Sequence, residues 1–132
     1  MEIINIASER ANLGESPVWS AGESALYWVD INGCRLHRAQ YPSLSIQSWV
    51  TPSRAGMIAL RSSGGLMVAM VDGIYAFDPD AENWQLLVAL ETDQPGNRPN
   101  DGKCDAAGRL WVGTMNIEDP MQPTGSFYRI DT

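Results

Sequence analysis

The segment of residues 97–115 decides the fold, and it reads NRPNDGKCDAAGRLWVGTM. It begins with a cluster of polar residues on a predicted turn and continues with a short strand at 103–105. A second turn at 106–109 then leads into an apolar strand at 110–115. Rigid sheets commonly carry reactive groups on their loops in this manner. Two earlier segments repeat the plan, so the sequence predicts a repeated strand–turn unit.

The repeat is visible in the turns that join the apolar runs. In the first unit, Asn32-Gly33 separates runs at 26–31 and 34–39, which predicts a hairpin with a type I′ turn. In the second unit, Asp72-Gly73 separates runs at 66–71 and 74–77. The two turns lie about 40 residues apart, which is the period of a four-stranded propeller blade. Each unit also has a tryptophan near one of its strands: Trp28, Trp84 and Trp111.

The predicted fold is all-β, built of propeller blades of four antiparallel strands. The blade units cover about 13–52, 54–92 and 98–132, and the last one lacks a fourth strand. A β-sandwich or a small barrel is the alternative, because both are also built from evenly spaced short strands. The matching turns favour blades.

An incomplete propeller would leave sheet edges that another chain could cover. Propellers usually close with about four to eight blades. About two and a half blades would leave a sheet edge exposed at 127–131, and such edges promote association. We therefore expect the N-terminal part of a single propeller domain, or a piece that covers its open edges by self-association or with a complementary fragment.

Size, composition and charge restrict the class of protein. The 132 residues can bury one core, and the apolar (44%) and charged (19%) fractions are those of a globular chain. A net charge of −7 argues against a nucleic-acid partner, which requires clustered Lys and Arg. No apolar run approaches the roughly 20 residues that span a bilayer, and the N-terminus does not predict a signal peptide. We expect a soluble cytoplasmic protein without a membrane partner, in which Cys34 and Cys104 are buried free thiols.

Polar residues precede the predicted innermost strand of each unit: Glu15, Arg54 and the pair Asn100-Asp101. In a propeller these positions lie at one mouth of the central channel, so three blades would direct their polar groups at one point. Carboxylate and amide oxygens suit Ca²⁺, Mg²⁺ or Mn²⁺, and a carboxylate joined by nitrogen ligands could hold Zn²⁺. The same residues could equally be ordinary loop and turn residues. His37, the only histidine, is predicted at the surface of a hairpin strand.

Three segments resemble one known family. They read LGESPVW at 13–19, LYWVDI at 26–31, and NRPNDGK at 97–103 followed by GRLWVGTM at 108–115. Together they are similar to the senescence marker protein / gluconolactonase / luciferin-regenerating enzyme family, the regucalcin-like proteins. The similarity runs in order along essentially the whole chain. The Arg-x-Asn-Asp-Gly-Lys and Gly-Thr-Met motifs are its most specific parts.

The resemblance implies a six-bladed propeller of roughly twice this length that binds one divalent cation in its channel and hydrolyses a sugar lactone. It makes Glu15 a metal ligand and makes Arg98, Asn100 and Glu118 substrate-contacting residues. The cation would be Ca²⁺, Zn²⁺, Mg²⁺ or Mn²⁺. The family's other metal ligands, including the expected general base, would lie beyond Thr132, so no catalytic residue is assigned within the chain.

The expected function is therefore divalent-metal-dependent hydrolysis of a sugar lactone by the full-length form. One carboxylate cannot alone satisfy Ca²⁺, which takes about six to eight oxygens. We expect the 132-residue chain by itself to bind metal weakly and to be inactive. The alternative is a non-enzymatic propeller that binds calcium or serves as an interaction scaffold, because propellers host many functions.

Overall fold

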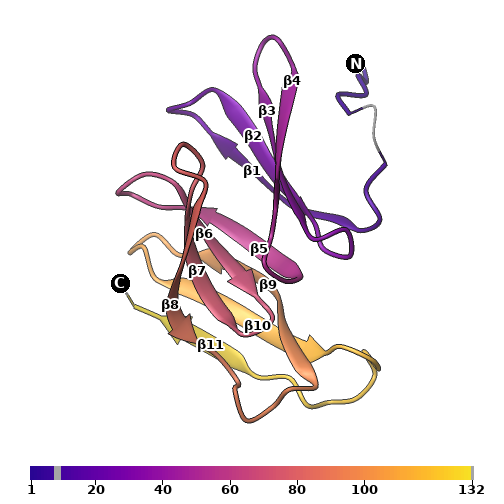
Figure 1. Ribbon diagram of the computed structural model, residues 1–132, viewed down its shortest axis with the longest axis vertical. Coiled ribbons are helices and arrows are strands. Elements are labelled where there is room, and N and C mark those ends of the chain that lie inside the picture. Colours follow the sequence, from indigo (N-terminus) through magenta and orange to yellow (C-terminus); the bar gives the residue numbers. More distant parts are fainter. Residues whose placement is uncertain (8–9, 132) are drawn as a thin grey trace.

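The computed structural model describes residues 1–7 and 10–131, and within these residues strands are the only regular elements. They form three antiparallel sheets that follow one another along the molecule (Figure 1). The first sheet contains β1 (Gly14–Ser20), β2 (Ala25–Asp30), β3 (Arg35–Gln40) and β4 (Ser45–Val50). The second contains β5 (Ala55–Leu60), β6 (Leu66–Met70), β7 (Gly73–Asp78) and β8 (Asn83–Ala89). The third contains β9 (Asn97–Cys104), β10 (Leu110–Asn116) and β11 (Phe127–Ile130).

Each sheet is a meander in which every strand pairs with the strand that follows it in the chain. β5, the first strand of the second sheet, contacts both β1 and β9. The first strands of the three sheets therefore lie side by side, as the innermost strands of successive blades do. The predicted all-β fold with blades of antiparallel strands is confirmed, with three strands in the third sheet among the described residues.

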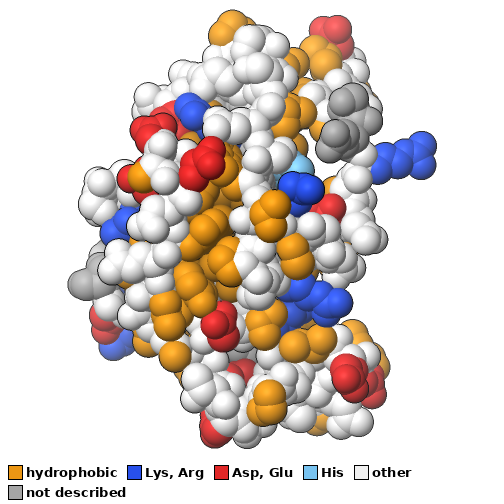
Figure 2. Space-filling view, in the orientation of Figure 1, with side chains coloured by type: hydrophobic (Ala, Val, Ile, Leu, Met, Phe, Trp, Pro, Cys, Tyr) orange, Lys and Arg blue, Asp and Glu red, His pale blue; other side chains and the backbone are white. Residues whose placement is uncertain are grey.

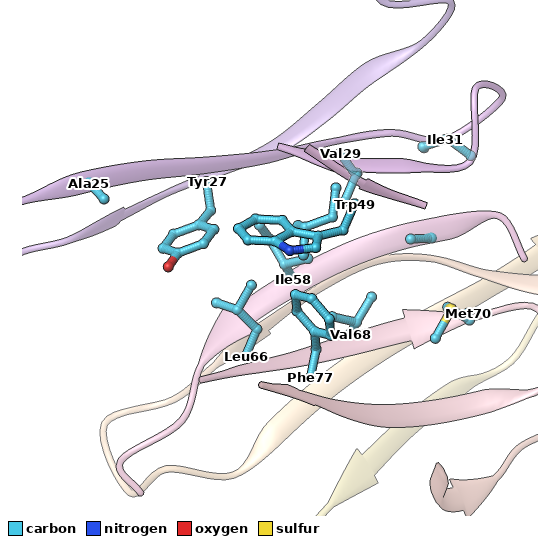
Figure 3. Close-up of a cluster of buried hydrophobic side chains, with 12 residues drawn as sticks. Ala25, Tyr27, Val29, Ile31, Trp49, Ile58, Leu66, Val68, Met70 and Phe77 are labelled. Carbon is cyan, nitrogen blue, oxygen red and sulfur yellow. The ribbon is translucent and has the colours of Figure 1, made fainter. Parts of the chain in front are cut away.

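Two hydrophobic clusters hold adjacent sheets together. The first cluster joins the first and second sheets, and Figure 3 shows side chains of both sheets pointing toward one another. In it, Trp49 meets the ring of Phe77 edge-on at 5.4 Å, and Phe77 stacks on Trp84 at 4.0 Å. The second cluster joins the second and third sheets, and among its members are Met57, Ile74, Leu110 and Val112.

The first three strands of the middle sheet, β5 to β7, are buried on both faces, and this explains their continuous apolar runs. Successive residues of a strand point to opposite faces of the sheet. In β6, Val68 belongs to the first cluster, whereas Met67 and Ala69 belong to the second. Both sets of positions must therefore be apolar, which is why β6 reads LMVAM without a polar residue.

Some large hydrophobic side chains remain at the surface. They include Leu86, Leu87 and Val88 on β8, and Trp111 and Phe127 on the third sheet. Figure 2 shows hydrophobic side chains gathered over the middle of the face that it draws. In the part of the chain that the structure describes, no helix has the length and apolar character needed to cross a membrane.

The turn after β2 differs from the prediction. Asp30 pairs with Arg35, so the loop has the four residues 31–34 instead of two. The left-handed conformation falls on Cys34 (φ 49°), and neither Asn32 nor Gly33 has a positive φ. The predicted type I′ turn is therefore wrong. The physical reason is the Asp30 carboxylate, which accepts a hydrogen bond from the Gly33 N–H at 3.0 Å and holds the wider loop.

Asp30 also anchors the chain that leads into β1. Its buried carboxylate accepts hydrogen bonds from the main-chain N–H groups of Asn12 and Leu13 at 2.8 and 2.9 Å. Burial alone would raise the pKa of Asp30, but these bonds, the Gly33 bond and the charge of His37 together hold the pKa below its ordinary value. The ionised form of Asp30 therefore stabilises the folded state.

We expect Asp30→Asn to lower the free energy of unfolding at pH 7 by about 2 kcal/mol, because a charged acceptor of several N–H groups is lost. The contribution of Asp30 is complete above its unfolded-state pKa of about 4 and is lost as the pH falls through the lower folded-state pKa. Urea unfolding of both proteins at pH 7 and at acidic pH measures this. A stability difference that stays constant as the carboxylate is protonated would contradict the assignment.

The beginning of the segment 97–115 lies in a strand, which corrects the turn predicted there. β9 begins at Asn97, and the predicted short strand at 103–105 overlaps only its end. The pairing with β10 passes from Asp101–Gly113 to Pro99–Thr114, so Asn100 is the extra residue of a β-bulge. The polar residues thus lie on an irregular strand. Its bulge, and not a turn, exposes Asn100.

Three further side chains bear on the predictions. His37 is 8% exposed, stacks on Trp28 at 5.0 Å and has its Nδ1 atom 2.7 Å from the Ser48 Oγ. The predicted surface histidine is therefore wrong, because an aromatic partner covers its ring. Both cysteines are free, as predicted, but Cys104 is exposed and Cys34 is partly exposed. Their predicted burial is wrong, because one lies near the end of β9 and the other in a loop.

Candidate functional site

Each of the three innermost strands contains a β-bulge near its beginning. The regular pairing is interrupted between Glu15 and Val18 in β1, between Ala55 and Met57 in β5, and at Asn100 in β9. A bulge bends its strand and redirects the neighbouring side chains, and bulges are common next to active sites. The candidate residues thus lie on or beside irregular strand segments that recur from sheet to sheet.

In β1 the bulge presents Glu15 to solvent. The next residue, Ser16, has a φ of 54°, and its Oγ accepts a hydrogen bond from the Ile58 N–H at 2.9 Å. This bond ties the bulge of β1 to β5. Glu15 is exposed, and its carboxylate has no hydrogen bond or ion pair with any other described residue. The carboxylate is therefore available to a ligand.

In β9, Arg98 and Asn100 contact each other. Arg98 is 8% exposed, and its Nη1 donates to the Pro99 carbonyl at 2.9 Å and to the Asn100 Oδ1 at 3.0 Å. Burial lowers the pKa of Arg98, and the positive charge of the exposed Arg54 lowers it further. A guanidinium nevertheless stays protonated near neutral pH. Arg98 therefore supplies a positive charge whose position is fixed by two hydrogen bonds.

β5 approaches the bulge of β9 through a glycine. A Cβ atom on Gly56 would collide with the carbonyl oxygen of Pro99 and would lie 2.7 Å from that of Asn100. These are main-chain atoms, which cannot rotate away as a flexible side chain can. Gly56 therefore permits a close approach of two backbones, and the placement of Arg98 and Asn100 depends on it.

One groove extends from Glu15 across β5 to the second half of β9. It has a volume of about 560 Å³ and is lined by residues 15–18, 58–60 and 101–104. Glu15 and the exposed Asp101 therefore line the same groove, although they belong to two different sheets. The guanidinium of Arg98 and the amide of Asn100 do not line this groove.

A second groove of about 740 Å³ lies beside the third sheet. Its lining includes Asn100 of β9, Thr114 and Met115 of β10, and residues 120, 122, 123, 125 and 126 of the following loop. Residues 101–103 of β9 line both grooves. Glu118 is exposed on that loop and lines neither groove. The structure thus brings Arg98 to Asn100, and Glu15 to Asp101, but it does not bring Glu118 to either pair.

The described residues offer only part of a metal site. Among residues 1–7 and 10–131, no three His, Cys, Asp or Glu side chains lie close enough together to hold an ion. Glu15 and Asp101 do offer carboxylate oxygens, which are the ligands that hard divalent cations prefer. Glu15 fits the role of one ligand, and a complete site would need further oxygen or nitrogen donors beside it.

Sequence reasoning does not single out three residues that position this site: Ser16, Gly56 and Asn97. Gly56 carries a usable signal, because an isolated glycine within a strand indicates a bulge or a close backbone approach. Ser16 carries none, since its partner Ile58 is 42 residues away. Asn97 likewise contacts a residue 27 positions further along the chain.

Known proteins are similar to this chain in sequence and in fold. The SMP-30/Gluconolactonase/LRE-like region matches residues 13–132. The chain is similar to the 6-deoxy-6-sulfogluconolactonase of Pseudomonas putida, with 41% identity over 103 residues, which cover 78% of this chain and 35% of that protein. It is also similar to regucalcin of Xenopus laevis, with 38% identity over 113 residues, which cover 86% of this chain and 38% of that protein.

A solved structure extends the comparison to three dimensions. The structure of the calcium-binding protein regucalcin from Agrobacterium tumefaciens matches this chain with a TM-score of 0.87 and 29% identity, over 94% of this chain and 42% of that one. The chain thus spans about two fifths of the length of the relatives that it matches. By sequence and by fold, this chain belongs to the SMP-30/gluconolactonase/LRE family.

Proposed function

We propose that this chain forms the first blades of a six-bladed propeller that hydrolyses a sugar lactone with the help of one divalent cation. The observation that carries the proposal is the Arg98–Asn100 pair, joined by a hydrogen bond on a bulged inner strand beside the groove that Glu15 lines. The family includes lactonases such as the Pseudomonas putida relative. The 132-residue chain alone is proposed to be inactive.

Each site residue has a distinct proposed role. Glu15 supplies one carboxylate to the cation, for which its exposure and lack of a described partner suit it. The cation, when bound, supplies Lewis-acid chemistry at the lactone carbonyl and acidifies a nearby water. Arg98 and Asn100 hold hydroxyl and ring oxygens of the sugar and so orient it. Because the Asn100 Oδ1 already accepts from Arg98, the Asn100 amide group presents its N–H donors to the substrate.

Two further roles lie outside the Arg98–Asn100 pair. Glu118 reaches the substrate only if the ligand extends toward the loop after β10, and it is proposed as a peripheral contact. The general base that takes the proton of the attacking water is proposed to come from a later blade.

Lactone turnover by a completed propeller tests this function. We define the six-bladed form as this chain followed by the remaining blades of the Pseudomonas putida relative. In a pH-stat assay with gluconolactone, the six-bladed form should hydrolyse the lactone well above the buffer rate. Removal of metal with EDTA should abolish the activity, and Ca²⁺, Zn²⁺, Mg²⁺ or Mn²⁺ should restore it. The 132-residue chain should stay at the buffer rate.

A non-enzymatic propeller is the second candidate, because a similar solved protein is described as calcium-binding. The six-bladed form would then bind Ca²⁺ in calorimetry without turning over any lactone. That outcome would contradict the lactonase proposal and support a calcium-binding module. Lactone turnover that persists unchanged in EDTA would instead contradict the role of the cation.

A further inference from the structure

The loop between β10 and β11 (residues 117–126) is tied to the first residue of β9. The Asn97 Nδ2 donates to the Thr124 carbonyl at 2.8 Å, and the Thr124 hydroxyl donates to the Asn97 Oδ1 at 2.6 Å. Both polar atoms of one amide thus engage a single residue 27 positions away. Asn97 is 3% exposed, whereas Thr124 is exposed. A buried side chain therefore holds a surface loop.

The start of the loop is held at the same place. The Ile117 N–H donates to the Gly96 carbonyl at 2.8 Å. Asn116 pairs with Asn97 in the sheet, and its Oδ1 accepts hydrogen bonds from the N–H groups of Glu118 and Asp119 at 3.0 Å each. The loop thus leaves β10 beside Asn97 and returns to Asn97 at Thr124.

The loop and β9 also share the second groove. Asn100 lines this groove from β9, and residues 120, 122 and 123 line it from the loop. Asn97 lies three positions before Asn100 and directly before Arg98, on the same strand. The residue that holds the loop is therefore part of the strand that carries the proposed substrate-contacting residues.

We propose that Asn97 is a positioning residue, which fixes the 117–126 loop as a wall of the groove that Asn100 opens on. In consequence the loop contacts the part of the sugar lactone that extends from Asn100. This second step rests on the proposed function, whereas the fixing of the loop does not. Asn97 touches neither the substrate nor the cation, so it acts on substrate binding and leaves the chemical step unchanged.

Hydrogen exchange of the 132-residue chain tests whether Asn97 fixes the loop. Asn97→Ala should speed amide exchange in residues 117–126 on the order of ten-fold, because the closed population falls. Thr124→Val removes the hydroxyl from the exposed side but keeps the bond from Asn97 to the Thr124 carbonyl, so it should speed exchange in the same residues by a smaller factor without endangering the fold. Thr124→Ser keeps the hydroxyl and should exchange as the unmodified chain does. Asn83→Ala, at the exposed start of β8, controls for loss of an amide elsewhere.

Lactone kinetics of the six-bladed form test the consequence for binding. Thr124→Val should raise KM several-fold with little change in kcat, since binding then requires the loop to be ordered first. Thr124→Ser should restore the original KM. Unchanged loop exchange in both Asn97→Ala and Thr124→Val would overturn the role of Asn97. Faster exchange in the 117–126 loop with an unchanged KM would contradict the proposed contact between the loop and the substrate. If the unmodified six-bladed form lacks turnover, the proposed function fails, and the exchange experiment alone decides on Asn97.

Discussion

Glu15→Gln should weaken divalent-cation binding by the six-bladed form about 100-fold, and metal-dependent lactone hydrolysis should fall with it. Glutamine has nearly the same shape as glutamate but offers a neutral amide oxygen in place of a carboxylate. Glu15 is exposed and has no hydrogen bond or ion pair within the described residues. Its loss therefore leaves the fold intact and removes only a ligand. Calorimetric titration with Ca²⁺ and Mn²⁺ measures the affinity, and the pH-stat assay measures turnover.

A matched charge change controls for the general electrostatic effect. Glu82→Gln alters an exposed residue on the turn between β7 and β8, away from the Glu15 groove. It should leave cation affinity and turnover unchanged. Equal losses in Glu15→Gln and Glu82→Gln would mean that net charge, and not a ligand at Glu15, governs binding. Unchanged affinity in Glu15→Gln would remove Glu15 from the metal site.

Gly56→Ala should lower the free energy of unfolding by about 3 kcal/mol, near the upper end of the usual cost of overpacking. The added Cβ would collide with the Pro99 carbonyl and crowd that of Asn100, so β5 and β9 would have to separate. Urea unfolding followed by tryptophan fluorescence measures the loss for the 132-residue chain. The displacement of β9 should also impair lactone hydrolysis by the six-bladed form, because Arg98 and Asn100 move with the strand.

Gly22→Ala provides the control for this substitution. Gly22 lies in the turn after β1, has no positive φ, and an added Cβ there would meet nothing within 4 Å. The alanine at this position should be neutral or slightly stabilising, since it restricts the unfolded chain. If Gly56→Ala had the same free energy of unfolding as Gly22→Ala, the close packing of β5 on β9 would not contribute to stability.

Much of the architecture could be predicted from the sequence because it depends on local patterns. The uninterrupted apolar run of β6 and the turn residues around Asp72 predict a buried strand and a hairpin. β6 and β7 form that hairpin, but its two-residue loop is Val71-Asp72, one position before the predicted Asp72-Gly73 turn. The period between matching turns then predicts successive blades. Glu15, Arg98 and Asn100 become candidates through their motifs, and the structure places them on bulged inner strands.

The errors arose where a contact that the local pattern does not reveal decides the structure. Asn32-Gly33 favours a tight turn, but the Asp30 carboxylate holds a longer loop by bonding the Gly33 N–H. The polar residues from 97 to 102 resemble a turn, but pairing with β10 keeps them extended. His37 looks like a surface residue until the sheet places it against the Trp28 ring. The link between Asn97 and Thr124 has no sequence signal at all, because it exists only after the third sheet has formed.

The most direct test of the central claim is the position of the cation. Crystals of the six-bladed form soaked in Mn²⁺ should give an anomalous difference peak within coordination distance of the Glu15 carboxylate, at the groove that Glu15 shares with Asp101. Glu15→Gln crystals treated in the same way should lack that peak. A peak at another site, with none at Glu15, would contradict the proposed metal centre and the lactone chemistry that depends on it.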